Sequence, residues 1–198
     1  MIAIIDYGAG NLRNVAKAFD YLGCDNIVTS DARVIKAADK IVLPGVGAFG
    51  EGMAKLTEKG LDKTIKAAVE NGTPILGICL GMQMLFEESE ESPNVKGLSL
   101  LKGKIRRLPK CGDLKIPHMG WNDLTCHGKL FKGLDNPFVY FVHSYYLDAE
   151  DKSVVSATVH YGIDIEVAVE CGNVFGFQFH PEKSGEEGLK MLSNFAKL

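Results

Sequence analysis

The chain has 198 residues, of which 46% are hydrophobic, 9% aromatic and 24% charged. This composition excludes a disordered chain, and the length suits one domain, residues 1–198, with a full-sized core. The net charge of −3 and the pI of about 6.0 give no overall positive field, so no nucleic-acid partner is expected. No apolar run reaches the ~20 residues of a membrane span, so no membrane partner is expected.

The first half of the chain alternates short apolar strands with helices. Ile2–Asp6 is the first strand, and Asn11–Leu22 follows with apolar residues at helical spacing. Further strands are expected at Asn26–Thr29, Lys40–Leu43 and Thr73–Ile78, and further helices at Met53–Glu70, with a possible break at Gly60, and from Leu80 to about Glu88. Apolar strands joined by helices predict an open, mostly parallel sheet with helices on both faces.

The second half is richer in strands, with turn residues between them. The expected strand segments are Leu101–Leu108, Leu114–Thr125, Phe138–Leu147, Ser153–His160 and Asp164–Phe179, followed by a helix near Gly185–Lys197. We interpret them as antiparallel additions to the parallel sheet. The expected fold class is therefore α/β, without a second domain.

The five cysteines are widely spaced and odd in number: Cys24, Cys79, Cys111, Cys126 and Cys171. The N-terminal residues read as a buried strand and not as a signal peptide, so reduced thiols and a cytoplasmic location are expected. No C-x-x-C occurs, and Cys126-His127 lacks a second ligand pair at zinc spacing. Neither a metal nor a cofactor is expected.

Cys79 lies where an apolar strand changes into a helix, within Gly77-Ile78-Cys79-Leu80-Gly81. Small residues two before and two after a nucleophile permit a strained strand-to-helix turn that exposes its side chain. The helix N-terminus then stabilises a thiolate and an oxyanion. A buried core cysteine is the alternative, and motif and location together favour the nucleophile.

His180 is the histidine best placed to act as the base for such a nucleophile. It ends the apolar run from Val174 to Phe179 and is followed by Pro181 and Glu182. Residues i and i+2 of an extended segment project to the same side, and we expect Pro181 to keep the chain extended here. Glu182 is then placed to orient the imidazole of His180. The alternative is a surface histidine beside a turn proline.

Two glycine-rich turns raise the possibility of a nucleotide site. Gly8-Ala9-Gly10 lacks the third glycine of a dinucleotide fingerprint, whereas the segment Gly45–Gly50 matches G-x-G-x-x-G. However, the acid that would bind a ribose falls near Glu70, at a helix end. A glycine turn that offers backbone N–H groups to an oxyanion is the better interpretation of Gly45–Gly47.

Three segments together resemble the class I glutamine amidotransferases: Pro44–Gly47, Gly77–Gln83 and Phe177–Glu182. The resemblance implies that Cys79 forms a glutamyl thioester with glutamine, while His180 transfers protons and Glu182 orients His180. It further implies an oxyanion site formed by Val46, Gly47 and Leu80, and a site for L-glutamine formed by Gly45, Gln83, Glu91, His143, Ser144 and Tyr145.

Four more segments resemble the glutaminase subunits of histidine biosynthesis: Asp6–Asn11, Pro117–Asn122, Tyr140–Ser144 and His180–Ser184. That resemblance implies a heterodimer with a separate (βα)8-barrel cyclase, which uses the ammonia to make imidazole glycerol phosphate and aminoimidazole carboxamide ribotide. It also implies that Trp121, Tyr140 and Lys183 lie near the interface. The 198 residues leave no room for an ammonia-using domain.

Other interpretations keep the same fold but change the function. Cysteine peptidases and chaperone-like hydrolases that share the elbow usually have histidine directly after the cysteine, where this chain has Leu80. A paralogous glutaminase that supplies another pathway would have the same active site. A catalytically silent binding module is a further alternative, although all three triad positions are filled.

Overall fold

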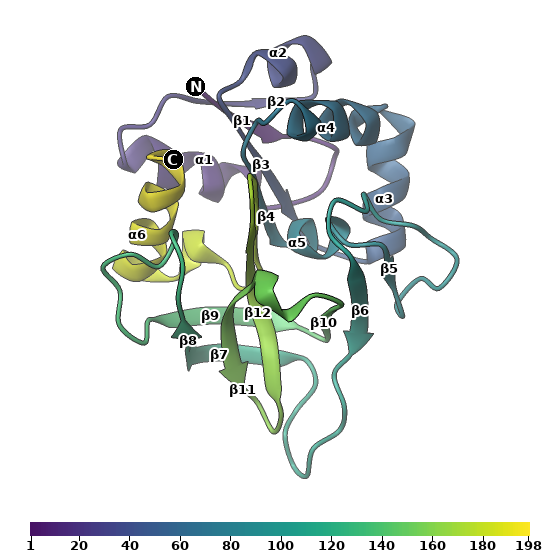
Figure 1. Cartoon of the computed structure of the whole chain (residues 1–198), viewed down its shortest axis with the longest axis vertical. Coiled ribbons are helices and arrows are strands. Elements are labelled where there is room, and N and C mark those ends of the chain that lie inside the picture. The colour runs from purple at the N-terminus through teal and green to yellow at the C-terminus, as the bar shows by residue number, and fades with distance from the viewer.

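Five parallel strands form the centre of the structure, a computed structural model that describes residues 1–198 (Figure 1). Their order across the sheet is β2, β1, β3, β4 and β13. Most of these strands are apolar and buried on both faces, as expected for a parallel sheet covered by helices. Their bounds are β1 Ile2–Ile5, β2 Asn26–Thr29, β3 Lys40–Gly45, β4 Ile75–Cys79 and β13 Val174–Phe177.

Helices cover both faces of this sheet, which confirms the predicted architecture (Figure 1). On one face, Ile2 and Ile4 join the core formed with α1 (Leu12–Tyr21) and α6 (Gly185–Ala196). On the other face, Ala3 and Ile5 join the core formed with α2 (Ala32–Ala37), α3 (Phe49–Glu58) and α4 (Leu61–Glu70). Alternate residues of one strand therefore supply two separate hydrophobic cores.

Antiparallel pairings extend the sheet beyond β13, as predicted for the second half of the chain, and only the short edge strand β5 pairs in parallel, with β6. The order continues through β12, β10, β6 and β5, and β11 pairs with both β12 and β8. The bounds are β5 Glu88–Ser89, β6 Gly103–Arg107, β8 Thr125–Cys126, β10 Tyr145–Ala149, β11 Val155–His160 and β12 Asp164–Cys171, with a 3-10 turn η1 at Lys152–Val154. No helix is long and apolar enough to cross a membrane.

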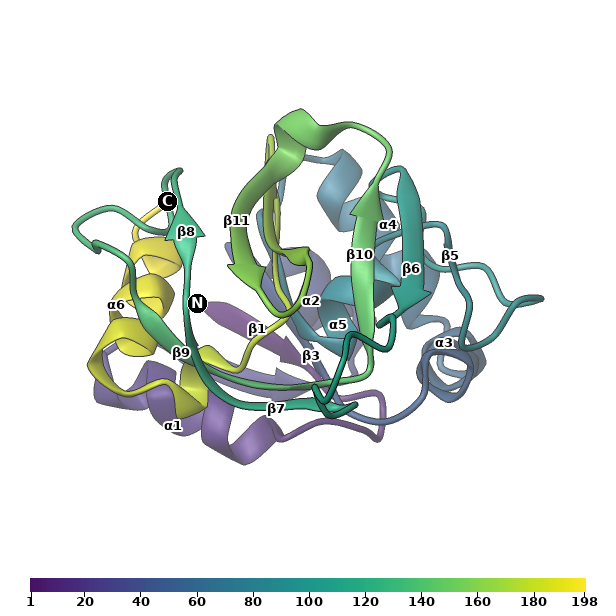
Figure 2. The ribbon, with the colours of Figure 1, turned by 90° about the horizontal axis from the view of Figure 1, so that it is seen from below.

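A separate two-stranded sheet consists of β7 (His118–Asp123) and β9 (Phe138–His143). In Figures 1 and 2 these strands run across the end of the central sheet at which α5 (Leu80–Met84) begins. β9 also contacts α6 and the 3-10 turn η2 (Pro181–Lys183). This small sheet therefore lies at the end of the molecule where β4 ends at Cys79.

Several expected boundaries were wrong. The segment Phe138–Leu147 is two strands, because the chain leaves β9 at Ser144 and enters the other sheet as β10. Asp164–Phe179 is likewise two strands, and the helix after Leu80 ends at Met84 instead of Glu88. The helical segment Met53–Glu70 begins earlier, at Phe49, and breaks as expected at Gly60, whose φ is +66°.

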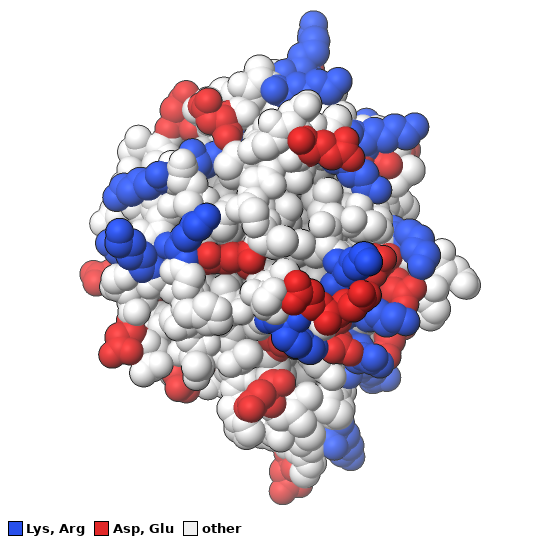
Figure 3. Space-filling model, in the orientation of Figure 1, with Lys and Arg blue, Asp and Glu red and all other residues white.

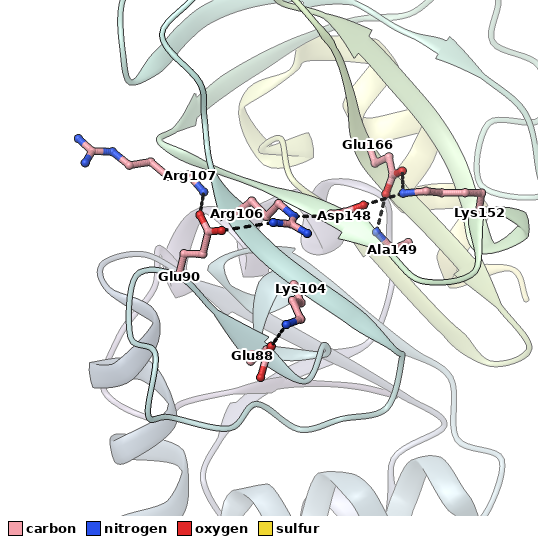
Figure 4. A network of polar contacts seen from close by, with 9 residues as sticks. All are labelled: Glu88, Glu90, Lys104, Arg106, Arg107, Asp148, Ala149, Lys152 and Glu166. Carbon is pink, nitrogen blue, oxygen red and sulfur yellow. Dashed lines mark hydrogen bonds and ion pairs between the residues drawn. The ribbon is translucent and has the colours of Figure 1, made fainter.

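Ion pairs link the antiparallel strands on their outer surface (Figure 4). Arg106 of β6 lies 2.6 Å from Asp148 of β10, and Lys152 contacts both Asp148 and Glu166 of β12. Arg106 also reaches Glu90 at 3.5 Å. In Figure 3 acidic and basic side chains intermingle here, so this surface has no large area of one sign.

Candidate active site

Cys79 lies at the junction of β4 and α5 in a backbone conformation that few residues other than glycine adopt. Its φ is +55° and its ψ is −113°. A Cβ on Gly77 would lie 2.6 Å from the Met82 nitrogen, and one on Gly81 would lie 1.7 Å from the Leu43 carbonyl oxygen. The two glycines therefore let α5 pack tightly against the sheet, and the elbow expected from the sequence is present.

His180 and Glu182 form a buried pair on the other side of the site. The Nδ1 atom of His180 lies 2.9 Å from Oε1 of Glu182, and their side chains are 2% and 1% exposed. The reason given for this contact from the sequence was wrong, because Pro181–Lys183 is a 3-10 turn and not an extended segment. The turn itself brings Glu182 back to His180.

The charge state of His180 follows from its neighbours. Burial alone lowers its pKa, but the interactions with Cys79 and with Glu182, whose Oε1 is hydrogen-bonded to Nδ1, outweigh burial and raise the pKa to about 9. Nε2 makes no hydrogen bond within the chain. An imidazolium at neutral pH, facing Cys79, is the arrangement that stabilises a thiolate.

A cavity of about 330 Å³ opens over Cys79 and His180. Its walls bring together residues from five separate parts of the sequence that were expected to share one site. Gly45 and Glu182 lie directly behind this lining, since Gly45 pairs with Cys79 in the sheet. The lining residues are Val46, Gly47, Cys79, Leu80, Gln83, Glu91, Pro117, Val142, His143, Ser144, Tyr145 and His180.

The turn at Gly45–Gly47 lines this cavity and has unbonded backbone donors. The N–H groups of Val46 and Gly47 make no hydrogen bond within the chain. Gly47 has a φ of +100° with no atom near its missing side chain, so conformation and not space requires glycine there. After the turn, the Phe49 N–H donates to Glu91 Oε2 at 2.7 Å, which ties the start of α3 to the cavity wall.

Two neutral histidines support the wall beside Tyr145. His143 Nδ1 lies 2.9 Å from the Tyr145 carbonyl oxygen and must donate to it, so Nε2 of His143 accepts from His118 Nδ1 at 3.0 Å. Burial lowers the pKa of His118 to about 4 and that of His143 to about 3. Both rings are therefore uncharged at neutral pH, and their hydrogen bonds have fixed directions.

Comparison with known proteins places this site in a family. The profile of the family Glutamine amidotransferase class-I matches residues 3–198. The chain belongs to this family. Imidazole glycerol phosphate synthase subunit HisH of Methanothermobacter thermautotrophicus is 50% identical over 200 residues, which cover 100% of this chain and 98% of that one. The HisH subunit of Geobacillus kaustophilus is 51% identical, with 98% and 95% covered.

Solved structures show the same fold at lower identity. A crystal structure of a glutamine amidotransferase has a TM-score of 0.79 at 21% identity and covers 100% of both chains. The structure of PurLQS from Thermotoga maritima has a TM-score of 0.76 at 23% identity and covers 99% of this chain and 97% of that one. The amidotransferase thus shares its architecture with proteins far from it in sequence.

Two lining residues of the amidotransferase, Pro117 and Val142, were not expected in the site, and neither was the buried Gln178 behind Cys79. Pro117 is the first residue of the segment Pro117–Asn122, and Val142 lies inside Tyr140–Ser144, so both motifs contained these residues without indicating their role in the cavity. Gln178 stands inside the Phe177–Glu182 motif. Nothing in the sequence shows that its side chain turns toward Cys79.

An aromatic patch covers the outer face of the β7–β9 sheet of the amidotransferase. Trp121 is 49% exposed and stacks on the half-exposed Phe138 at a centroid distance of 6.0 Å. Tyr140 contacts Trp121 edge-on, and the Lys183 ammonium lies 5.8 Å from the Tyr140 ring centroid. The structure therefore brings together Trp121, Tyr140 and Lys183. The exposed residues Met119 and Phe138 complete this surface and were not expected.

Proposed function

We propose that this chain is the glutaminase subunit of imidazole glycerol phosphate synthase and that it hydrolyses glutamine at Cys79. The observation that carries this proposal is the strained Cys79 facing the buried His180–Glu182 pair inside one small cavity. The HisH relatives, about 50% identical over the whole chain, support the same activity.

In the first half of the reaction, the Cys79 thiolate attacks the carboxamide carbon of glutamine. The carbonyl oxygen becomes an oxyanion, which the N–H groups of Leu80 and of the Val46–Gly47 turn would stabilise, since these residues line the cavity. His180 then gives its Nε2 proton to the amide nitrogen. The C–N bond breaks, ammonia leaves, and a glutamyl thioester remains on Cys79.

In the second half, neutral His180 takes a proton from water as the water oxygen attacks the thioester carbon. The C–S bond breaks, so that glutamate leaves and Cys79 returns as a thiolate beside the imidazolium of His180. Glu182 keeps the imidazole oriented through both halves by its 2.9 Å contact with Nδ1. The balance is glutamine plus water to glutamate plus ammonia.

The wall opposite Cys79 suits the amino-acid end of glutamine. The Glu91 carboxylate lines the cavity and uses Oε2 to accept from Phe49, which leaves Oε1 for the substrate ammonium. Gln83, His143, Ser144 and Tyr145 line the same cavity. An ion pair between Glu91 and the substrate ammonium at one end, and backbone N–H donors at the other, would hold glutamine with its carboxamide over Cys79.

The aromatic patch is the proposed contact surface for the second subunit, a (βα)8-barrel cyclase in a heterodimer. Exposed aromatic residues in contact with a cation are typical of interface centres. The patch also lies next to the reaction centre, because the backbone N–H of His180 donates to the backbone carbonyl oxygen of Tyr140 at 3.1 Å. Ammonia would then leave the cavity close to the subunit that consumes it.

The test of this function is glutamine hydrolysis by the chain together with a cyclase subunit. Cys79→Ala should abolish glutamate formation with little change in unfolding temperature, because only the nucleophile is removed. Cys171→Ala, at an exposed free cysteine, is the matched control and should remain active. A glutamine-like alkylator should label Cys79 alone, and labelling of another cysteine instead would contradict the assignment.

A further inference from the structure

Gln178 is a fully buried polar residue directly behind the nucleophile. It follows β13 and has an exposed fraction of 0%. Its Oε1 atom accepts from Gln83 Nε2 at 2.9 Å, and its Nε2 atom lies 3.7 Å from the Cys79 sulfur. One side chain therefore joins a residue of the cavity wall to the reacting atom.

A backbone carbonyl fixes which end of each amide faces which neighbour. Gln83 Nε2 also lies 3.4 Å from the Tyr145 carbonyl oxygen, which can only accept. Turning the Gln83 amide over would place two oxygens against each other, so Gln83 must donate to Gln178 Oε1. The remaining Nε2 of Gln178 then points to sulfur, and Gln83 Oε1 stays free at the cavity.

We propose that Gln178 is a positioning residue for glutamine hydrolysis that holds the Cys79 thiolate by a donated N–H and aligns Gln83 for substrate. This inference rests on the proposed role of Cys79 as the nucleophile. A buried thiolate depends on protein donors for its stabilisation, and a hydrogen bond to a charged group is stronger than one between neutral groups. Gln178 supplies such a donor, in addition to the imidazolium of His180.

A purely structural role is the alternative, in which Gln178 is only a satisfied core amide. The two roles differ in what they do to the sulfur. A structural amide changes folding stability alone, whereas a donor to the thiolate also changes the pH at which Cys79 reacts. Alkylation of Cys79 by iodoacetamide measures this directly and needs neither glutamine nor the partner.

The test compares wild type with Gln178→Met, which keeps length and approximate volume but has no amide. The pH of half-maximal Cys79 alkylation should rise by about 1, and kcat for glutamine in the two-subunit enzyme should fall roughly ten- to a hundredfold. Gln178→Glu should move the alkylation profile further in the same direction, because a carboxylate would face the thiolate.

Asn173→Leu is the matched control, since this amide lies just before β13 and donates to the carbonyls of Val69 and Thr73. It should lower stability without moving the alkylation profile. An unchanged profile and kcat in Gln178→Met would overturn the proposal, and should that variant not fold, an unchanged profile in Gln178→Glu would do so. If the wild-type chain with its cyclase subunit did not hydrolyse glutamine at all, that result would instead overturn the proposed function.

Discussion

Two glycines flank Cys79 in the sequence, and the space left by their missing side chains sets how closely α5 approaches β3 and β4. At Gly81 an added Cβ would lie 1.7 Å from a backbone oxygen of β3, far inside any real contact. Gly72 is the opposite case, because its φ is +91° but no atom lies within 4 Å of its missing side chain. The chain thus requires glycine for two different physical reasons.

Gly81→Ala should therefore destabilise the chain by about 3 kcal/mol or more, because α5 or β3 must move to relieve an overlap with backbone. Gly72→Ala, the control, should cost only the strain of a left-handed alanine, about 1–2 kcal/mol. Urea unfolding of both variants measures the difference. Equal losses would contradict the requirement for space at Gly81, because its backbone conformation is one that alanine adopts freely.

The sequence predicted those residues of the site that stand in short, recognisable motifs. Cys79 was predicted from its glycine-flanked elbow, and His180 and Glu182 from their place after an apolar strand, although the 3-10 turn that joins them was not foreseen. Gln178 could not be found in this way. Its partners Cys79 and Gln83 are 99 and 95 positions away, and only the folded sheet brings them together.

At the scale of elements, the parallel half was predicted better than the antiparallel half. Buried parallel strands are apolar throughout and stand out in the sequence, as in Ile75–Cys79. Helix α2 was missed because its six residues bury only Ile35 and show no helical periodicity. The break at Ser144 was missed because β9 and β10 alternate alike, and only tertiary structure assigns them to different sheets.

The His118–His143 pair gives the β7–β9 sheet a pH dependence of known sign. The pKa values of both histidines are lowered by burial, to about 4 and about 3, from about 6.5 in an unfolded chain. The unfolded state therefore binds more protons as the pH falls from about 6.5 to 4. The stability that these neutral rings contribute is complete above pH ~6.5 and is lost through that window.

We expect His118→Phe to make the free energy of unfolding fall less steeply between pH 6.5 and 5. The reason is that the unfolded variant has one histidine fewer to take up a proton in this range. The ring should still stack on Phe141 and Tyr161, as His118 does at 4.6 and 4.0 Å. Stability at pH 7 should fall, since His143 loses its donor. Urea unfolding across this pH range measures both effects, and His127→Phe, at an exposed position, should leave the slope as it is.

At the scale of the whole molecule, the cavity and the aromatic patch share the end of the sheet where β3 and β4 finish. The β7–β9 sheet joins them, with Tyr140 in the patch and His143 in the cavity wall. One continuous sheet carries both the parallel and the antiparallel strands. That the chain forms one domain, as the sequence analysis expects, stays a prediction, and a single cooperative unfolding transition would support it.

We expect a partner bound at the aromatic patch to influence the Gly45–Gly47 turn on the cavity wall. Ammonia made without an acceptor wastes glutamine, so we expect the chain to be nearly idle alone and to gain activity when the cyclase and its nucleotide substrate bind. Gly47 is the natural switch, because glycine permits backbone states that other residues resist and its N–H is unbonded. The partner would favour the competent turn by differential contact free energy.

Gly47→Pro should cut partner-stimulated kcat by ~10²–10³, the usual effect of losing one oxyanion donor, because proline has no N–H and cannot adopt a φ of +100°. KM for glutamine should change far less, since the residues that bind its amino-acid end remain. Gly47→Ala keeps the N–H but resists this φ, and its intermediate loss would separate conformation from donor. Steady-state glutamate formation with and without the cyclase subunit and its ligand measures all three enzymes. Full activity of the isolated wild-type chain, unchanged by the partner, would remove the switch, because the turn would then be competent without any contact at the aromatic patch.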